Sequence, residues 1–195
     1  RRKSDDSSSA FGTLADAGAH DTASPASPIV SFFLGGTDGK GRSIDQLLAM
    51  TDASLESAHD YIQYLFPTSE RSRFVCDAPV VTENDMLAFV SHRCHVQEAM
   101  LRCLRRMMEF YGLEVLEDGG DGSVKVEMRA NFDPHARWMS YHGGTPDHNA
   151  LRLTRIIASL RLFSLEKHAD ALKICLLQSL PQLSRHPSRT YWEGA

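Results

Sequence analysis

The strongest constraint on the fold of this chain is a long helical period between residues 93 and 111. Apolar side chains recur there at spacings of three and four residues, which places them on one face of a helix. The members of this row are Val96, Met100, Cys103, Leu104, Met107 and Tyr111. Gly112 follows at the position where a helix commonly ends in a left-handed residue. We therefore predict one long helix whose apolar face must be covered by the rest of the chain.

The remaining segments supply shorter helices and one change of period. Between residues 113 and 128 the apolar period becomes two on either side of a glycine-rich turn, which is typical of a β-hairpin. The fold class that we expect is therefore all-α, mainly a helical bundle, with one small β-hairpin. Helical spacing, capping residues and prolines predict the shorter helices over residues 44–48, 55–66, 83–89, 146–163 and 165–180.

Composition divides the 195-residue chain into three parts. Residues 1–28 are rich in Ser, Ala and Asp and show neither a helical nor a strand period, so we predict a disordered N-terminal tail. Residues 29–180 contain the periodic apolar segments and form the expected ordered domain. Residues 181–195 follow the last predicted helix as a C-terminal extension.

Charge, cysteine usage and hydropathy limit the function classes. The chain has 21 Lys and Arg residues against 25 Asp and Glu residues, a net charge of −4, so no DNA partner is expected. The four cysteines contain no C-x-x-C pair, which favours reduced thiols in an intracellular compartment. Because no apolar run approaches the ~20 residues of a membrane span, no transmembrane segment is expected.

Two segments resemble a known family. Residues 59–67 read His-Asp-Tyr-Ile-Gln-Tyr-Leu-Phe-Pro, and residues 148–157 read His-Asn-Ala-Leu-Arg-Leu-Thr-Arg-Ile-Ile. Both are similar to signature stretches of the conserved region of the opioid growth factor receptor family. Further matches, such as Gly-Arg-Ser-Ile-Asp at residues 41–45, occur in the order that this family uses. The resemblance covers about residues 29–180, and Tyr64 stands where the family usually has tryptophan.

The resemblance implies a function that the residues alone do not. It implies a non-enzymatic receptor or interaction module for a short enkephalin-type peptide or a protein segment, associated with restraint of cell proliferation. Such receptors are unrelated in architecture to seven-helix receptors. The resemblance also implies an intracellular protein of the cytoplasm or nucleus, and it leaves peripheral membrane association open.

The two signature segments, with two aromatic residues between them, form the candidate ligand site. An arginine fork buried in a helical core needs a carboxylate or amide partner, so we expect Asp60 or Gln63 to approach Arg152 or Arg155. This polar seam is a ligand site if it borders a groove, and structural if it is sealed. The first segment contributes His59, Asp60, Gln63 and Tyr64. The second contributes His148, Asn149, Arg152 and Arg155, and Trp138 and Tyr141 precede it.

Two alternatives use these or other polar residues. The His, Asp, Asn and Arg side chains of the signature segments would serve an enzyme or nucleotide-handling domain if they converge on an open pocket. Arg102, Arg105 and Arg106 would contact phosphates in a nucleic-acid-binding module. The compact His and Cys set at residues 92–95 lacks an evident fourth ligand, so no metal site is predicted. No cofactor and no catalytic residue are expected, because the chain carries no recognised catalytic motif.

Overall fold

The computed structural model describes residues 27–130, 148–179 and 189–195, and the structural statements below concern these residues. All but the last two residues of the predicted N-terminal tail lie outside them. Trp138 and Tyr141 also lie outside the described residues, so their place in the candidate site stays a prediction.

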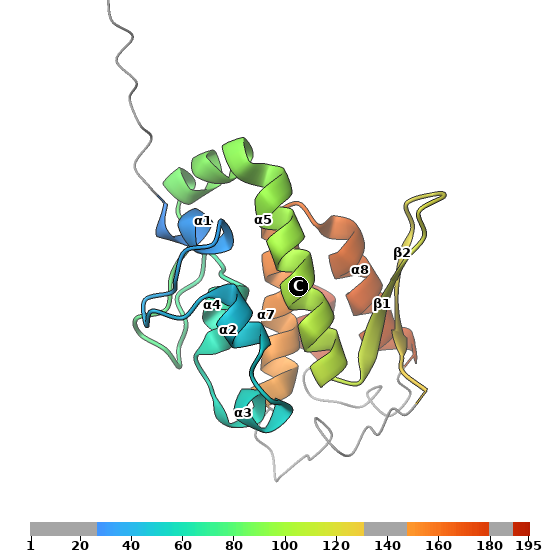
Figure 1. Ribbon diagram of the computed structural model, residues 1–195. Coiled ribbons are helices and arrows are strands. Elements are labelled where there is room, and N and C mark those ends of the chain that lie inside the picture. Colours follow the sequence, from blue (N-terminus) through green and yellow to red (C-terminus); the bar gives the residue numbers. More distant parts are fainter. Residues whose placement is uncertain (1–26, 131–147, 180–188) are drawn as a thin grey trace, which may run out of the picture.

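The fold is mainly helical with one β-hairpin, which confirms the predicted fold class. Figure 1 shows α5 running through the middle of the molecule, with α1 to α4 on one side and α8 and the hairpin on the other. The helices are α1 (Pro28–Phe33), α2 (Ile44–Leu48), α3 (Asp52–Ser57), α4 (Tyr61–Leu65), α5 (Glu83–Phe110), α7 (His148–Leu162), α8 (Glu166–Ile174) and α9 (Arg189–Gly194). A π-helical turn, η1 (Cys175–Ser179), continues α8, and the strands are β1 (Leu113–Glu117) and β2 (Val124–Met128).

The central helix α5 contains both the predicted long helix and the short helix before it. Thr82 and Asp85 form a capping box at its start, in which each side chain accepts a hydrogen bond from the backbone of the other residue. The backbone leaves the helical conformation at His92 (φ −122°, ψ 18°), and this kink divides α5 into two helical parts. The two helices that the sequence predicts therefore both form, and they meet at the kink at His92 within α5.

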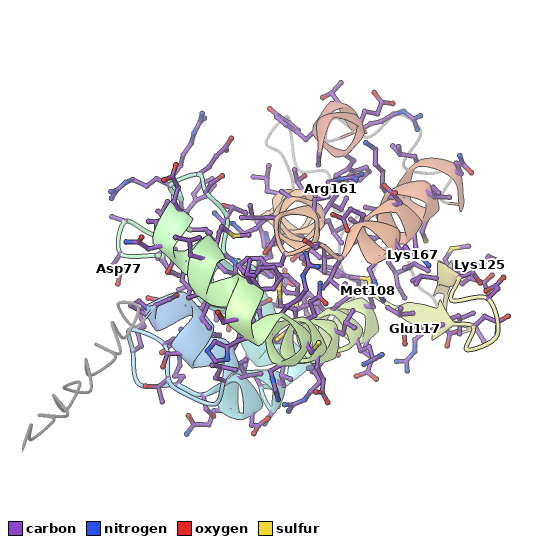
Figure 2. The ribbon with its side chains drawn as sticks, turned by 90° about the horizontal axis from the view of Figure 1, so that it is seen from above. Asp77, Met108, Glu117, Lys125, Arg161 and Lys167 are labelled. Atoms are coloured by element: carbon purple, nitrogen blue, oxygen red, sulfur yellow. The ribbon has the colours of Figure 1, made fainter. Side chains whose placement is uncertain are left out.

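The apolar row of α5 forms the centre of the core. Cys103 and Leu104 of α5 are fully buried, and they belong to the same cluster as Leu153 and Ile157 of α7. Met108, which is labelled in Figure 2, is fully buried as well. Burial of one such side chain contributes roughly 1.5–3 kcal/mol. The core therefore fixes one face of α7 and leaves its opposite face for another role.

The hairpin forms where the change of period predicts it. β1 and β2 pair antiparallel with Val115 opposite Val126, and β2 lies against α8. Glu117, at the end of β1, accepts hydrogen bonds from Arg105 of α5 (2.9 Å) and contacts His168 of α8 (3.1 Å). These polar contacts attach the hairpin to the helices on both sides of it.

The predicted helix over residues 55–66 is in fact two short helices, α3 and α4. Ala58 ends α3 with an extended backbone (φ −80°, ψ 136°). In an unbroken helix, the carbonyl oxygens of Leu55 and Ala58 would accept hydrogen bonds from amides four residues later. Here both accept hydrogen bonds from Arg152 of α7, at 3.2 and 2.5 Å. A contact with a distant helix thus replaces helical hydrogen bonds, and the period of the sequence does not report it.

Candidate functional site

The two signature segments pack against each other, as predicted, but through different partners. Arg152 and Arg155 of α7 both donate hydrogen bonds to backbone carbonyl oxygens of residues 55–66. In the described part of the chain, no hydrogen bond or ion pair joins either arginine to Asp60 or Gln63, so that part of the prediction is wrong. The acceptors lie at the ends of α3 and α4, where carbonyl groups have no partner within their own helix.

Arg152 is a structural residue. Its side chain is buried, and Nη1 donates to the carbonyl oxygen of Leu55 (3.2 Å) and to Oδ1 of Asn149 (2.9 Å). Nη2 donates to the carbonyl oxygen of Ala58 (2.5 Å), and the guanidinium lies over the ring of Tyr61, 5.3 Å from its centroid. Because these contacts hold α3, α4 and α7 together, Arg152 is committed to the fold.

Arg155, three residues further along α7, forms fewer hydrogen bonds with the protein than Arg152 does. Its Nη1 donates to the carbonyl oxygen of Phe66, the residue that caps the end of α4 (3.1 Å). Burial lowers the pKa of Arg155 from its usual value, and the negative charge of Glu70 opposes this effect only in part. The guanidinium still carries its charge at neutral pH, since arginine does not lose its proton in proteins.

Asp60 and Tyr64 face the loop before α2 and not α7. The Asp60 carboxylate pairs with Lys40 Nζ (2.6 Å) and Arg42 Nη2 (3.1 Å). Burial alone would raise the pKa of Asp60, but hydrogen bonds from Lys40 and Arg42 hold it below its usual value. Arg42 also lies over the buried ring of Tyr64, 5.7 Å from its centroid. This cluster stabilises the loop around residues 38–42.

The start of α7 is anchored to α3 by a shared carboxylate. Glu56 accepts a hydrogen bond from Asn149 Nδ2 (3.0 Å) and contacts His148 Nε2 (3.0 Å). Asn149 is fully buried, so its amide belongs to the interior of the fold. The rings of His148 and His59 lie beside each other, with centroids 5.5 Å apart. Both histidines are exposed, and they form a rim at this end of α7.

A groove of about 990 Å³ follows the face of α7 that points away from α5. One wall is the loop of residues 68–74 and the other is α9, including Tyr191. α9 is held there by Trp192, which is fully buried and donates from Nε1 to the carbonyl oxygen of Ala150 (3.2 Å). Figure 2 places Arg161, which also lines the groove, on the α9 side of α7. The floor residues recur at helical spacing and are His148, Leu151, Arg155, Ala158 and Leu162.

The groove gathers some of the candidate residues and not others. Asp60, Tyr64 and Asn149 do not line it, because the fold uses them in the loop cluster and at the start of α7. The run Arg-Ser-Arg-Phe at residues 71–74 is not among the predicted site residues, because it has no helical or strand period. The described candidates that line the groove are His59, Gln63, His148, Arg152 and Arg155. The lining residues that were missed are Arg71, Arg73, Phe74, Arg161 and Tyr191.

The arrangement does not favour the two alternatives. Asp60 and Asn149 do not line the groove, and Arg152, which does, is engaged by contacts within the protein, so the acidic and amide members of the His, Asp, Asn and Arg set are missing from it. The three arginines of α5, Arg102, Arg105 and Arg106, pair with Asp45, Glu117 and Asp52. Figure 2 shows Glu117 at the hairpin end of the molecule, apart from Arg161. The positive charge of these three arginines is therefore neutralised locally, away from the groove.

The two buried cysteines lie in the core. Burial raises the pKa of Cys103 to about 12 and that of Cys175 to about 11, which makes both thiols unreactive core residues. Within residues 27–130, 148–179 and 189–195, no three or more His, Cys, Asp and Glu side chains are grouped to hold a metal ion. None of the helices in these ranges combines the length and the apolar character needed to cross a membrane.

Comparison with known families matches residues 40–185 to the opioid growth factor receptor conserved region. This range contains the loop of residues 68–74 and the whole of α7. The floor of the groove and one of its walls therefore lie inside the part of the chain that the family shares. No solved structure matches the chain.

Curated relatives show the same similarity. The chain is 38% identical to the rat opioid growth factor receptor over 130 residues, which is 66% of this chain and 21% of the relative. It is 35% identical to the human opioid growth factor receptor over 113 residues, 57% of this chain and 15% of the relative. Rat opioid growth factor receptor-like protein 1 is 29% identical over 106 residues, 54% of this chain and 21% of the relative. The chain thus spans about a fifth of the length of the curated relatives it matches.

Proposed function

The chain belongs to the opioid growth factor receptor conserved-region family, and on that premise we propose that it is a non-enzymatic receptor or interaction module for a short peptide or protein segment. Several relatives are named as receptors, and a receptor needs a site for a ligand. The groove on α7 is the observation that carries the proposal, because three of its five floor residues, His148, Leu151 and Arg155, belong to the second signature segment. The first signature segment, residues 59–67, contributes His59 and Gln63 to the same groove.

The dimensions of the groove suit an extended peptide. Its floor reaches from His148 to Leu162, which are 14 residue steps apart. At about 1.5 Å per residue, this stretch of helix is about 21 Å long. An extended chain advances about 3.3 Å per residue, so about six residues cover the floor. The volume of about 990 Å³ lies at the upper end of the range for ligand pockets, about 300–1,000 Å³.

An enkephalin-type peptide is the first ligand to test, because the relatives are named for an opioid growth factor. We also propose that this chain takes part in growth-related signalling in the cytoplasm or nucleus. This proposal rests on the conserved region alone, since the chain spans only about a fifth of the length of those relatives.

Calorimetric titration with an enkephalin pentapeptide and a panel of six-residue peptides tests the proposal. Ala158→Arg places a long side chain on the floor of the groove, and arginine is a good helix former. We expect at least one peptide to bind the wild-type protein and Ala158→Arg to weaken that binding at least tenfold. Ala53→Arg introduces the same side chain at an exposed position of α3 outside the groove, and it should leave binding unchanged. Absence of any binding, or binding that Ala158→Arg leaves intact, would contradict the proposal.

A further inference from the structure

The groove carries an excess of positive charge. Five arginines line it, Arg71, Arg73, Arg152, Arg155 and Arg161, against one acidic side chain, Glu70. The chain as a whole has a net charge of −4, so this excess is local. A cleft lined by one sign of charge favours a ligand of the opposite sign.

These arginines differ in how far the protein satisfies them. Arg152 is buried and bonded on several sides, and Arg161 pairs with Asp170 (2.7 Å). Arg155 has a single hydrogen bond, to a neutral carbonyl oxygen, and no carboxylate of the described residues forms an ion pair with it. A cation that is removed from water costs free energy unless it is paired. Arg155 is therefore the residue on the floor that an anion would satisfy best.

The position of Arg155 indicates which kind of anion fits. It lies seven residues after His148 and seven before Leu162, at the middle of the floor. A segment that covers the floor continues in both directions past this point. The anion facing Arg155 should therefore be a side chain within the segment and not the carboxylate at its end.

Exposed aromatic residues stand on both walls of the groove. Phe74 on the loop is 75% exposed, and Tyr191 on α9 is 53% exposed. Large apolar side chains that are exposed together mark surfaces used for contact with a partner. Between them the floor offers Leu151, Ala158 and Leu162 as apolar surface. Aromatic side chains beside the acidic residue of a ligand would find contacts on both walls.

We propose that the groove selects a peptide segment in which an acidic side chain, flanked by aromatic or apolar residues, pairs with Arg155. This inference rests on the proposed function, since it names the class of ligand for the same groove. Arg71 and Arg73 on the loop add to the attraction of the acidic segment.

The same cations would attract a phosphate, but the surroundings favour a carboxylate. Binding of a nucleic-acid strand needs a track of free cations along the backbone. Here Arg152 and Arg161 are engaged by the protein itself, and the chain is net acidic. Arg155 is the one arginine among the five floor residues, it is half-buried, and apolar residues lie on both sides of it. Its guanidinium therefore fits one carboxylate better than a row of phosphates.

Selection from a displayed library of random heptapeptides tests the inference. The peptides are fused at their C-termini to the carrier, so that none has a free terminal carboxylate. Parallel selections use the wild-type protein and the variants Ala158→Arg and Arg155→Gln. Arg155→Gln removes the charge but keeps a donor for the carbonyl oxygen of Phe66, and Arg105→Gln removes the same charge at the hairpin end as a matched control.

We expect peptides with Asp or Glu beside aromatic residues to be enriched on the wild-type protein and on Arg105→Gln, and this enrichment to vanish on Arg155→Gln. A selected peptide is then synthesised with blocked ends, together with its Glu→Gln or Asp→Asn counterpart. The acidic form should bind the wild-type protein about tenfold more tightly than the amide form. On Arg155→Gln, the two forms should bind equally.

Several outcomes would overturn the inference. Groove-dependent peptides without acidic residues, or equal discrimination by wild type and Arg155→Gln, would remove it while leaving the proposed function in place. A single-stranded oligonucleotide that displaces the peptide, with affinity that falls steeply as salt rises, would replace it with nucleic-acid binding. Enrichment that Ala158→Arg does not reduce would remove the proposed function itself. If Arg155→Gln lowers the melting temperature strongly, the acidic and amide peptides on the wild-type protein decide the question.

Discussion

Arg152 and Arg155 lie three residues apart on α7 but belong to different regions of the molecule. Arg152 enters the buried corner between α3, α4 and α7, where carbonyl oxygens and an amide surround it. Arg155 lies on the floor of the open groove and reaches one carbonyl oxygen. The difference comes from the acceptors that the short helices offer. An arginine on α7 has a structural role where buried helix ends offer it carbonyl oxygens. It can contact a ligand where the floor of the groove is open to solvent.

The largest effect that we expect comes from the buried corner. Arg152→Met should lower the free energy of unfolding by about 3 kcal/mol, because one buried and one partly buried carbonyl group lose their donor. Urea denaturation at pH 7 measures this change. Arg161→Met, on the same helix but in a more exposed ion pair, should cost less than about 1 kcal/mol. Equal losses in the two variants would show that the buried corner is not special.

The second largest effect should come from Asp60. Its contribution to stability should depend on pH, because it forms ion pairs, whereas that of Arg152 should not, because its acceptors are neutral. Asp60→Asn should lower the free energy of unfolding by about 1 kcal/mol at pH 7, because the pairs with Lys40 and Arg42 are lost. The pKa of Asp60 is lower in the folded protein than the usual value of 3.8, so the folded state releases this proton more readily than the unfolded state.

This contribution to stability is therefore complete above about pH 4 and is lost as the pH falls through the folded-state pKa. Melting temperatures of wild type and Asp60→Asn should draw together as the pH is lowered below the usual pKa of an aspartate, 3.8. The deficit of Arg152→Met, which involves neutral acceptors, should persist over the same range. A deficit of Asp60→Asn that does not change with pH would contradict this assignment.

Arg155 should show the opposite balance to Arg152. We expect Arg155→Ala to lower the free energy of unfolding by less than about 1 kcal/mol, because one hydrogen bond from a partly exposed side chain is lost. The sequence allows two outcomes for this substitution: a loss of a few kcal/mol if it leaves a buried carboxylate without its partner, or an unchanged melting temperature with loss of peptide affinity if Arg155 binds a ligand. Because Arg155 contacts a carbonyl oxygen and forms no ion pair with a carboxylate of the described residues, we expect the second outcome. Thermal denaturation and peptide titration of this variant should show a small change in the first and a large one in the second.

The smallest change in stability should come from the walls of the groove. Phe74→Ser and Tyr191→Ser should each alter the free energy of unfolding by no more than about 0.5 kcal/mol, since both side chains are exposed. Both should weaken binding of a peptide selected on the wild-type protein. Leu87→Ser, at an exposed apolar position of α5 outside the groove, is the control and should do neither. Unchanged binding in both wall variants would remove the aromatic contacts from the account.

Sequence reasoning recovers those parts of the fold that depend on local signals. The row from Val96 to Tyr111 predicts most of α5, and the period of two predicts the hairpin. The break between α3 and α4 could not be predicted, because the carbonyl groups of Leu55 and Ala58 find their donor on α7, far away in the sequence. Such a contact leaves no trace in the spacing of apolar residues.

The sequence predicts which helix carries the candidate site, but it does not predict the hydrogen-bond partners of the arginines on that helix. Resemblance to the family directed attention to α7, and Arg155 does line the groove. The sequence predicts Asp60 or Gln63 as the partner, because a side-chain carboxylate or amide can be identified in a sequence, whereas a backbone carbonyl has no side-chain signature. The loop of residues 68–74 has no period from which its position could be inferred. Tyr191 lies in the extension that was set apart from the ordered domain.

Hydrogen–deuterium exchange with and without a selected acidic peptide tests the central claim most directly, because it reports where the ligand lies. If the groove on α7 is the binding site, exchange should slow in the loop of residues 68–74 and in α9, the two walls. The hairpin of residues 113–128, at the other end of the molecule, should be unaffected. Slower exchange at the hairpin with no change in the loop or in α9 would contradict the account.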